Sequence, residues 1–149
     1  MKRGRIIHQF YETFLSLKGE PDALAAGLAL GVFVGVTPTI PFHTAIILLL
    51  ALPLRLNITA AYLGSWIISN PVTIPILYAS QYELGRVLLG MQHPPIVFAG
   101  CSLEEIVIMG GKILFPLQIG GILMAPFIAV PAYFVSYHLI RVLRARERL

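Results

Sequence analysis

Two dipeptides, Thr37-Pro38 and Asn70-Pro71, each interrupt a long apolar stretch, and polar side chains gather around both. The residues that could do chemistry at these two breaks are Thr37, Pro38, Thr39, His43, Thr44, Asn70, Pro71, Thr73 and Tyr78. Asn70 is a favourable helix cap with Pro71 at the first helical position, and Thr37-Pro38 can act in the same way. Two helix starts that face each other inside a membrane would offer N–H groups and positive dipole ends to an anion. The pattern therefore predicts a ligand site at these residues.

The same residues also fit a purely structural interpretation, and both readings stay open. Pro, Thr and Asn can shape a tight turn while their side chains cap the neighbouring helices. His43 carries the same ambiguity, because an imidazole in an apolar interior usually bonds a neighbour, although ionisable groups there are often functional. The chain contains no Ser-His-Asp set, zinc motif or Walker loop. We therefore predict no catalytic residue, no metal site and no cofactor.

The two breaks belong to an internal repeat. Residues 30–41, LGVFVGVTPTIP, return 33 positions later as LGSWIISNPVTIP at residues 63–75, with Val72 inserted. Paired broken segments in the two halves of a membrane protein are the best sequence indicator of a binding site. Repeat 1 is expected over about residues 23–54 and repeat 2 over about residues 56–86.

Composition indicates that this repeat lies in a membrane. Apolar residues make up 57% of the chain, charged residues only 12%, and the mean hydropathy is +0.82. Soluble domains carry about 25% charged residues. The net charge of +4 comes largely from basic chain ends, which membrane insertion requires, so it does not indicate a nucleic-acid partner. We expect an integral membrane protein whose immediate partners are lipids.

The helices on either side of each break are short for a membrane. Residues 23–36 would form a helix of about 21 Å, whereas the hydrocarbon core is about 30 Å thick and needs about 20 residues. Each repeat is therefore expected to be a Pro-broken helical hairpin, either re-entrant or spanning, and the short lengths favour the re-entrant form. The small residues Gly27, Gly31 and Gly35 recur every fourth position, with Gly64 in repeat 2, and predict close helix packing between repeats or subunits.

The expected fold class is an all-α membrane protein with distinct segments at both ends. An amphipathic helix in the membrane interface is predicted over residues 1–19, followed by a membrane domain over residues 20–140. Within it, residues 90–112 are expected to form a loop and a short helix that starts at a capping box, Ser102–Glu105. Residues 113–140 carry no charge and should form a transmembrane helix kinked by prolines and glycines. Residues 141–149 form a basic tail.

The charges do not give one consistent topology. Arg55, Arg86 and Lys112 join the basic termini, which suggests a single cytoplasmic side for all of them. A single final span would nevertheless place the arginine-rich tail on the other side. Either the last segment folds back near Gly120-Gly121, or one earlier segment crosses. Glu83 is expected to pair with Arg86 where repeat 2 leaves the membrane.

The middle of the chain resembles a known family. The matching residues are Gly35–Pro38, Pro41–Thr44, Leu54–Asn57, Gly64–Trp66, Asn70–Thr73, Pro75, Tyr78 and Tyr82–Gly85. They are similar to the prokaryotic domain of unknown function 2062, a family of small integral membrane proteins, and the resemblance covers about Pro21 to Ile140. It implies a protein of the bacterial inner membrane without an established activity. In some relatives a similar domain accompanies a glycosyltransferase.

Two functional hypotheses follow. The first is a small oligomeric transporter or lipid-handling protein that binds an anionic group between the two breaks. The second is a non-enzymatic membrane scaffold that docks a partner such as a glycosyltransferase, motivated by the interfacial helix and the basic tail.

Overall fold

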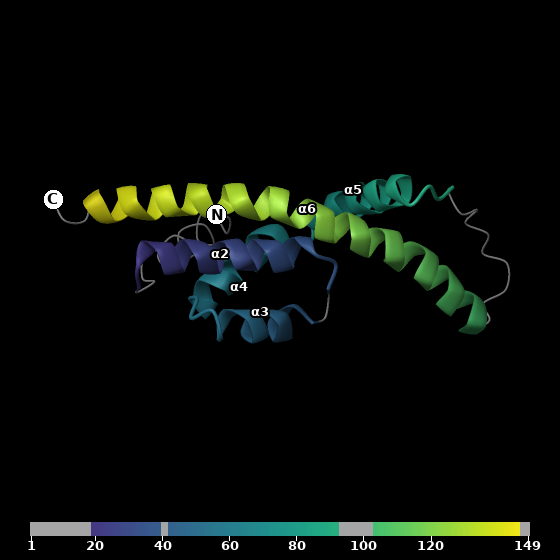
Figure 1. The fold of residues 1–149 in the computed structure, drawn as a ribbon, viewed down its shortest axis with the longest axis horizontal. Coiled ribbons are helices and arrows are strands. Elements are labelled where there is room, and N and C mark those ends of the chain that lie inside the picture. Colours follow the sequence, from purple (N-terminus) through teal and green to yellow (C-terminus); the bar gives the residue numbers. More distant parts are fainter. Residues whose placement is uncertain (1–18, 40–41, 93–102, 147–149) are drawn as a thin grey trace, which may run out of the picture.

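The computed structural model describes residues 19–39, 42–92 and 103–146. These ranges contain five helices and no strand, which confirms the expected all-α class. The helices are α2 (Pro21–Val36), α3 (His43–Ala51), α4 (Ile58–Ile68), α5 (Thr73–Leu88) and α6 (Leu103–Arg146), shown in Figure 1. The predicted interfacial helix lies outside the described residues except for Gly19. Most of the predicted loop, including Ser102, and the last three residues of the tail also lie outside them.

Helices α2 and α4 lie side by side and run in the same direction. Gly27 of α2 faces Asn57, Gly31 faces Ala61, and Gly35 faces Ser65. A Cβ atom on Gly27 would lie 2.6 Å from the Asn57 carbonyl oxygen, and one on Gly31 would overlap the Ala61 carbonyl. Because the helices are parallel, both end at the same level, and the two breaks follow at the same end of the pair.

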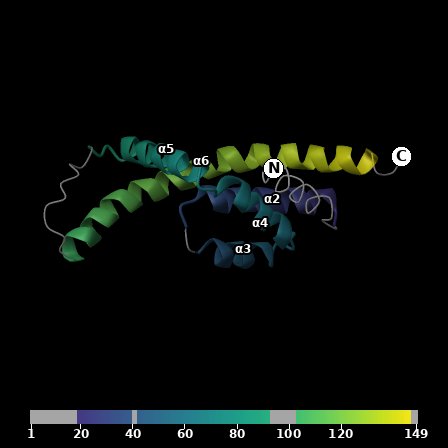
Figure 2. The same ribbon diagram turned by 180° about the vertical axis from the view of Figure 1, so that it is seen from behind.

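Helix α3 folds back along this pair, so that α2 and α3 form a hairpin (Figures 1 and 2). The helix ends at Ala51, three residues before the expected end of repeat 1 at about residue 54. It ends where the N–H of Leu56 donates to the Ala51 carbonyl at 2.9 Å and that of Arg55 donates to the Leu52 carbonyl at 3.1 Å. These two bonds form a Schellman motif, which satisfies the last carbonyls of α3.

The second break does not produce the hairpin that the repeat predicts. Helices α4 and α5 are bent by 79° at the break, and α5 packs against α6 instead of returning along α4. Two close backbone contacts hold α5 there: Gly85 lies against the Pro116 carbonyl, and Gly120 lies against the Gln81 carbonyl. The direction in which the chain continues after each break is therefore set by the helix against which the next segment packs, and not by the residues of the break.

Helix α6 is one continuous helix of 44 residues, and this corrects the expected division into a short helix, a span and a tail. Gly110 and Gly111 do not interrupt it, since a glycine costs a helix only about 1 kcal/mol relative to alanine. Pro116, Pro126 and Pro131 lie inside it, as prolines do in membrane helices where neighbouring segments compensate the lost bonds. The bonds from Tyr133 to Asp22 and from Arg144 to the Gly19 carbonyl show that α6 runs antiparallel to α2 (Figure 1).

The helices carry the surface of a membrane-associated protein. One helical stretch, Gly110–Ala145, is long and apolar enough to cross a membrane, and the bent pair α4–α5 meets the same criteria when taken together. Large apolar side chains are widely exposed; Trp66 is 77% exposed and Phe127 is 81% exposed. Water-soluble monomers rarely expose such extended apolar surfaces. The long apolar helix indicates membrane association.

Candidate functional site

At the first break, the polar groups bond mainly to one another. Thr37 is buried, and its Oγ1 donates to the Val34 carbonyl at 2.8 Å, within the last turn of α2. The Thr37 carbonyl accepts the Thr39 N–H at 2.8 Å and His43 Nε2 at 3.2 Å. Thr37 therefore ends α2 and does not cap the return helix, which begins six residues later at His43. The expectation that Thr37-Pro38 starts α3 is wrong.

At the second break, Asn70 acts as the predicted cap. Its Oδ1 accepts the N–H groups of Val72 at 3.0 Å and Thr73 at 3.1 Å, and its Nδ2 donates to the Ile67 carbonyl at 3.0 Å. Thr73 Oγ1 adds a bond to the Ile68 carbonyl. The Asn70 side chain thus engages two of the N–H groups that the predicted anion would have used. These are the bonds expected of a turn-shaping role.

The two breaks lie next to each other and are joined by a serine that the sequence analysis did not single out. Ser69 Oγ donates to the Gly35 carbonyl at 2.9 Å, which links the end of α4 to the end of α2. Beyond this point the return helices diverge, because α3 folds back and α5 continues toward α6. Thr44 is exposed on α3, and Tyr78 is half-buried on α5. The structure therefore brings the breaks together but not all nine predicted residues.

Gln81 is a second residue that the sequence analysis missed. It is fully buried where the end of α2, the middle of α5 and the centre of α6 meet. Its Nε2 donates to the Val36 carbonyl at 2.6 Å, while its Oε1 has no hydrogen-bond partner among the described residues. A signal was present, since an amide within an apolar helix is costly unless it is bonded.

An open groove of about 820 Å³ lies beside the first break, between α3 and the N-terminal half of α6. Most of its lining is apolar. The lining residues are Pro38, Thr39, Phe42, Ala45, Ile46, Leu49, Gly111, Leu114, Phe115 and Gln118. We call it the α3–α6 groove. Two of the predicted site residues, Pro38 and Thr39, contribute to it. Polar groups come from Thr39 and Gln118, and the next residue after Gly111 is the exposed Lys112.

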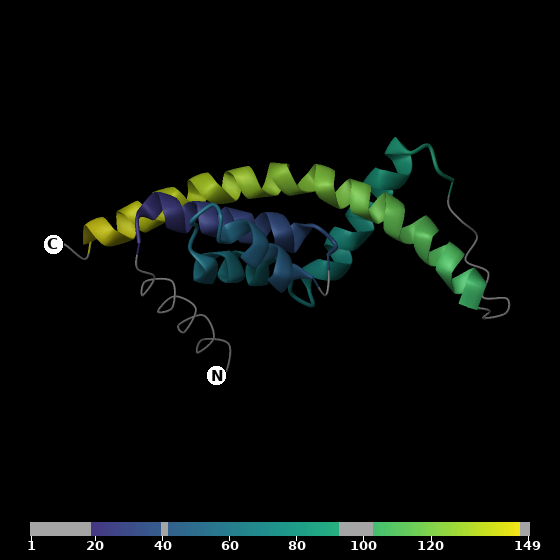
Figure 3. The ribbon, with the colours of Figure 1, turned by 60° about the horizontal axis from the view of Figure 1, so that its bottom comes forward.

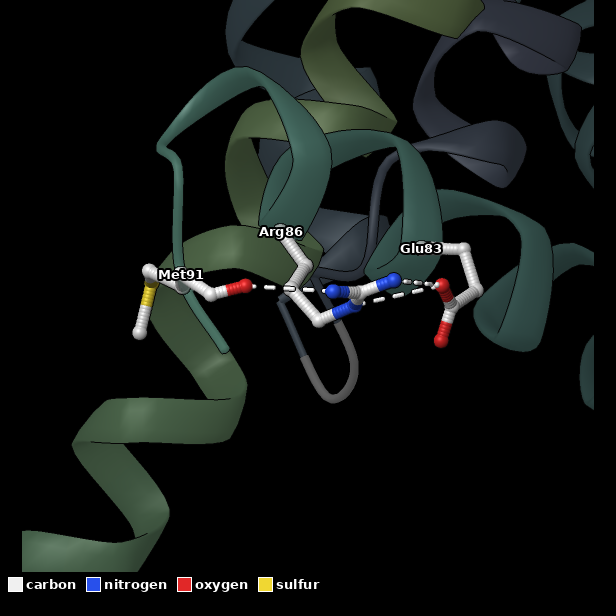
Figure 4. Close-up of polar contacts among 3 residues, drawn as sticks. All are labelled: Glu83, Arg86 and Met91. Carbon is white, nitrogen blue, oxygen red and sulfur yellow. Dashed lines mark hydrogen bonds and ion pairs between the residues drawn. The ribbon is translucent and has the colours of Figure 1, made fainter. Parts of the chain in front are cut away.

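Glu83 and Arg86 form the predicted ion pair near the end of α5. Arg86 Nη2 lies 2.7 Å from Glu83 Oε2, and Arg86 Nη1 donates to the Met91 carbonyl at 3.1 Å (Figure 4). The helix ends with Gly90 in the left-handed region, where the Met91 N–H donates to the Arg86 carbonyl at 3.0 Å. The pair ties the residues that follow α5 to its last turn.

The comparisons with known proteins place the chain in an uncharacterised bacterial family. A family model described as "Uncharacterized protein conserved in bacteria (DUF2062)" matches residues 4–148. Neither the curated proteins nor the solved structures contain a match. The described residues hold no group of three or more His, Cys, Asp and Glu side chains that could bind a metal ion.

Proposed function

The chain belongs to the uncharacterised bacterial family DUF2062, for which no activity is described. We propose, from the geometry of the groove, that it is a lipid-handling membrane protein. It would hold one anionic lipid in the α3–α6 groove. This proposal moves the ligand from between the two breaks to one side of the first break. The reason is that the break residues already bond to one another, while the groove is open.

The single observation that carries the proposal is the composition of the groove walls. One wall is α6, the helix long and apolar enough to cross a membrane. The large side chains on both walls are exposed, including Phe42, Leu49, Leu114 and Phe115. An acyl chain lying in the groove would pack against these side chains by van der Waals contact, the attraction that acts between apolar groups inside a membrane.

The polar groups at the groove favour a lipid over an unfunctionalised hydrocarbon. Thr39 and Gln118 can exchange hydrogen bonds with a glycerol or ester group. Lys112, next to the lining residue Gly111, supplies a cation for a phosphate. The chemistry that fits is therefore an anionic phospholipid with its chain along Leu114 and Phe115.

The test fills the groove without disturbing the core. Gly111 and Gly110 are adjacent in α6, and a Cβ atom added at either would meet no atom within 4 Å. Only Gly111 lines the groove. We expect Gly111→Trp to lower crosslinking to a photoactivatable phosphatidylglycerol by about tenfold, which corresponds to about 1.4 kcal/mol, while Gly110→Trp leaves it unchanged. Equal crosslinking of both variants would refute the groove as the binding site.

The charge preference needs a separate measurement. Lys112→Gln should weaken binding of phosphatidylglycerol and leave binding of phosphatidylethanolamine unchanged, because only the first lipid has a net negative charge. Native mass spectrometry of the protein released from mixed nanodiscs counts both lipids at once. An equal loss of the two lipids would contradict the role of Lys112.

A further inference from the structure

Most of the described cations belong to segments at one end of the molecule. The turn between α3 and α4, the start of α2 at Pro21 and the C-terminal end of α6 all lie at the left in Figure 1, and Arg144 near the end of α6 donates to the Gly19 carbonyl. We call this end the basic pole. Among the residues that the structure describes, the cations of these segments are Arg55, Arg141, Arg144 and Arg146. The other two described cations are Arg86 and Lys112.

This distribution orients the protein in the membrane. Lysines and arginines in short loops and at chain ends are retained on the cytoplasmic side. With four described cations against two, and with Arg86 paired to Glu83, the basic pole belongs to the cytoplasm. The start of α2, the α3–α4 turn and the end of α6 would then share that side.

The α2–α3 hairpin and the bent pair α4–α5 allow the chain to cross the membrane twice and still have both ends on one side. The α2–α3 hairpin starts and finishes at the basic pole, so it enters the membrane and returns. The bent pair α4–α5 is apolar enough to serve as one broken span, and α6 provides the return crossing. A re-entrant hairpin followed by two crossings leaves both chain ends in the cytoplasm. The arginine-rich tail is then on the expected side.

The position of the groove along α6 follows from a fixed contact at the other end. Tyr133 bonds to Asp22 in the first turn of α2 and so marks the level of the basic pole. Phe115 of the groove lies 18 residues earlier in the same helix, at most about 27 Å away at about 1.5 Å per residue. That distance is close to the roughly 30 Å thickness of the hydrocarbon core. The groove therefore lies near the far face of the membrane, with Lys112 one turn beyond Leu114 and Phe115 toward that surface.

We infer that the α3–α6 groove takes its anionic lipid from the outer leaflet of the membrane, in a chain that crosses twice and has both ends in the cytoplasm. The inference rests on the proposed lipid-binding function for the ligand and on the basic pole for the side. Its two parts can fail separately, and the experiments keep them apart.

Topology is tested with single cysteines in the full-length protein carrying Cys101→Ser. Gln92→Cys lies after α5, Leu54→Cys in the α3–α4 turn, and Ala145→Cys near the end of α6; all three side chains are exposed. With a membrane-impermeant maleimide on intact spheroplasts, we expect full labelling of Gln92→Cys. Leu54→Cys and Ala145→Cys should react only after permeabilisation. Labelling of Ala145→Cys or Leu54→Cys in intact spheroplasts, or protection of Gln92→Cys, would overturn the topology.

The leaflet is tested by placing photoactivatable phosphatidylglycerol in one leaflet of proteoliposomes by lipid exchange. Protein orientation in the same vesicles is read from the labelling of Gln92→Cys. We expect crosslinking when the probe occupies the leaflet on the Gln92 side, and a loss of that signal in Gly111→Trp but not in Gly110→Trp. Crosslinking only from the opposite leaflet would overturn the outer-leaflet inference and keep the groove. Absence of groove-dependent crosslinking from both leaflets would overturn the proposed function itself.

Discussion

Arg55 occupies a backbone position that usually belongs to glycine. It is the left-handed residue of the Schellman motif that follows α3, and its φ of 55° makes it the one described non-glycine residue with a positive φ. The corresponding position after α5 is Gly90, with a φ of 61°. A non-glycine residue in this conformation costs about 1 kcal/mol or more. In the proposed topology the α3–α4 turn faces the cytoplasm, and a cation at this turn favours that orientation.

Replacing Arg55 with glycine should therefore separate stability from orientation. We expect Arg55→Gly to raise the free energy of unfolding by about 1 kcal/mol, because the left-handed strain is relieved. The same change should increase the fraction of wrongly oriented protein, because the turn loses its cation. Thermal unfolding in detergent measures the first effect, and maleimide labelling of Leu54→Cys measures the second. A less stable glycine variant would contradict this account of the turn.

Gln81 should respond very differently to two substitutions of nearly its own size. Gln81→Met removes the bond to the Val36 carbonyl and should cost about 1 kcal/mol, the net value of one hydrogen bond. Gln81→Glu places a carboxylate in a fully buried site and should cost about 3 kcal/mol or more. Gln92→Glu is the matched control, because Gln92 is exposed and surface changes stay within about 0.5 kcal/mol. Denaturant unfolding in micelles measures all three, and a mild effect of Gln81→Glu would show that the introduced carboxyl group is protonated or that water reaches the site.

At the scale of the helices, α2 and α4 are locked by one contact that occurs twice. Gly31 lies against the Ala61 carbonyl, and Gly64 lies against the Leu28 carbonyl. Gly64 is 33 residues after Gly31, and Ala61 is 33 residues after Leu28, which is the offset of the repeat. The two contacts are therefore the same contact with the repeats exchanged. Glycine permits this close backbone approach, as it does in parallel membrane helix pairs.

Methyl groups at these two glycines should separate the helices. We expect Gly31→Ala and Gly64→Ala each to destabilise the protein by about 1–3 kcal/mol, the usual cost of overpacking. Gly110→Ala should instead stabilise by about 1 kcal/mol, because that helical glycine meets no atom and alanine is the better helix former. Thermal unfolding of the three variants in one detergent provides the comparison. Similar behaviour of Gly31→Ala and Gly110→Ala would show that α2 and α4 pack less tightly.

The sequence predicts the helix cap at the second break but not the direction that the chain takes after it. Asn70 caps its helix as expected because capping depends on bonds within three residues. The 79° turn that follows depends on Gly85 and Gly120, whose contacts join segments more than thirty residues apart. The groove was not predictable for the same reason, since Thr39 and Gln118 are distant in sequence. The glycines and prolines of α6 suggested that this helix would be interrupted, but it is continuous. Their effect on a helix depends on neighbouring segments, which the sequence of one segment does not reveal.

At the scale of the whole molecule, the helices form two unequal parts. The bundle consists of α2, α3, α4 and the C-terminal half of α6, and the arm consists of α5 and the N-terminal half of α6 (Figure 3). They meet where Gly121 touches Pro38 and where Gln81 bonds to Val36. Only the arm and the first break contribute the polar lining of the groove. A change that loosens the arm should therefore affect lipid binding before it affects the bundle.

Hydrogen exchange of the Gly85→Ala variant tests this division. A Cβ atom on Gly85 would overlap the Pro116 carbonyl, so the methyl group must push α5 away from α6. We expect faster amide exchange across α5, with exchange in α2 and α4 unchanged, because their contact through Gly31 and Gly64 does not involve the arm. Gly31→Ala should give the opposite pattern, with α2 and α4 faster and α5 protected. Faster exchange in every helix of either variant would mean that the molecule opens as one unit, and then the groove could not change without the bundle.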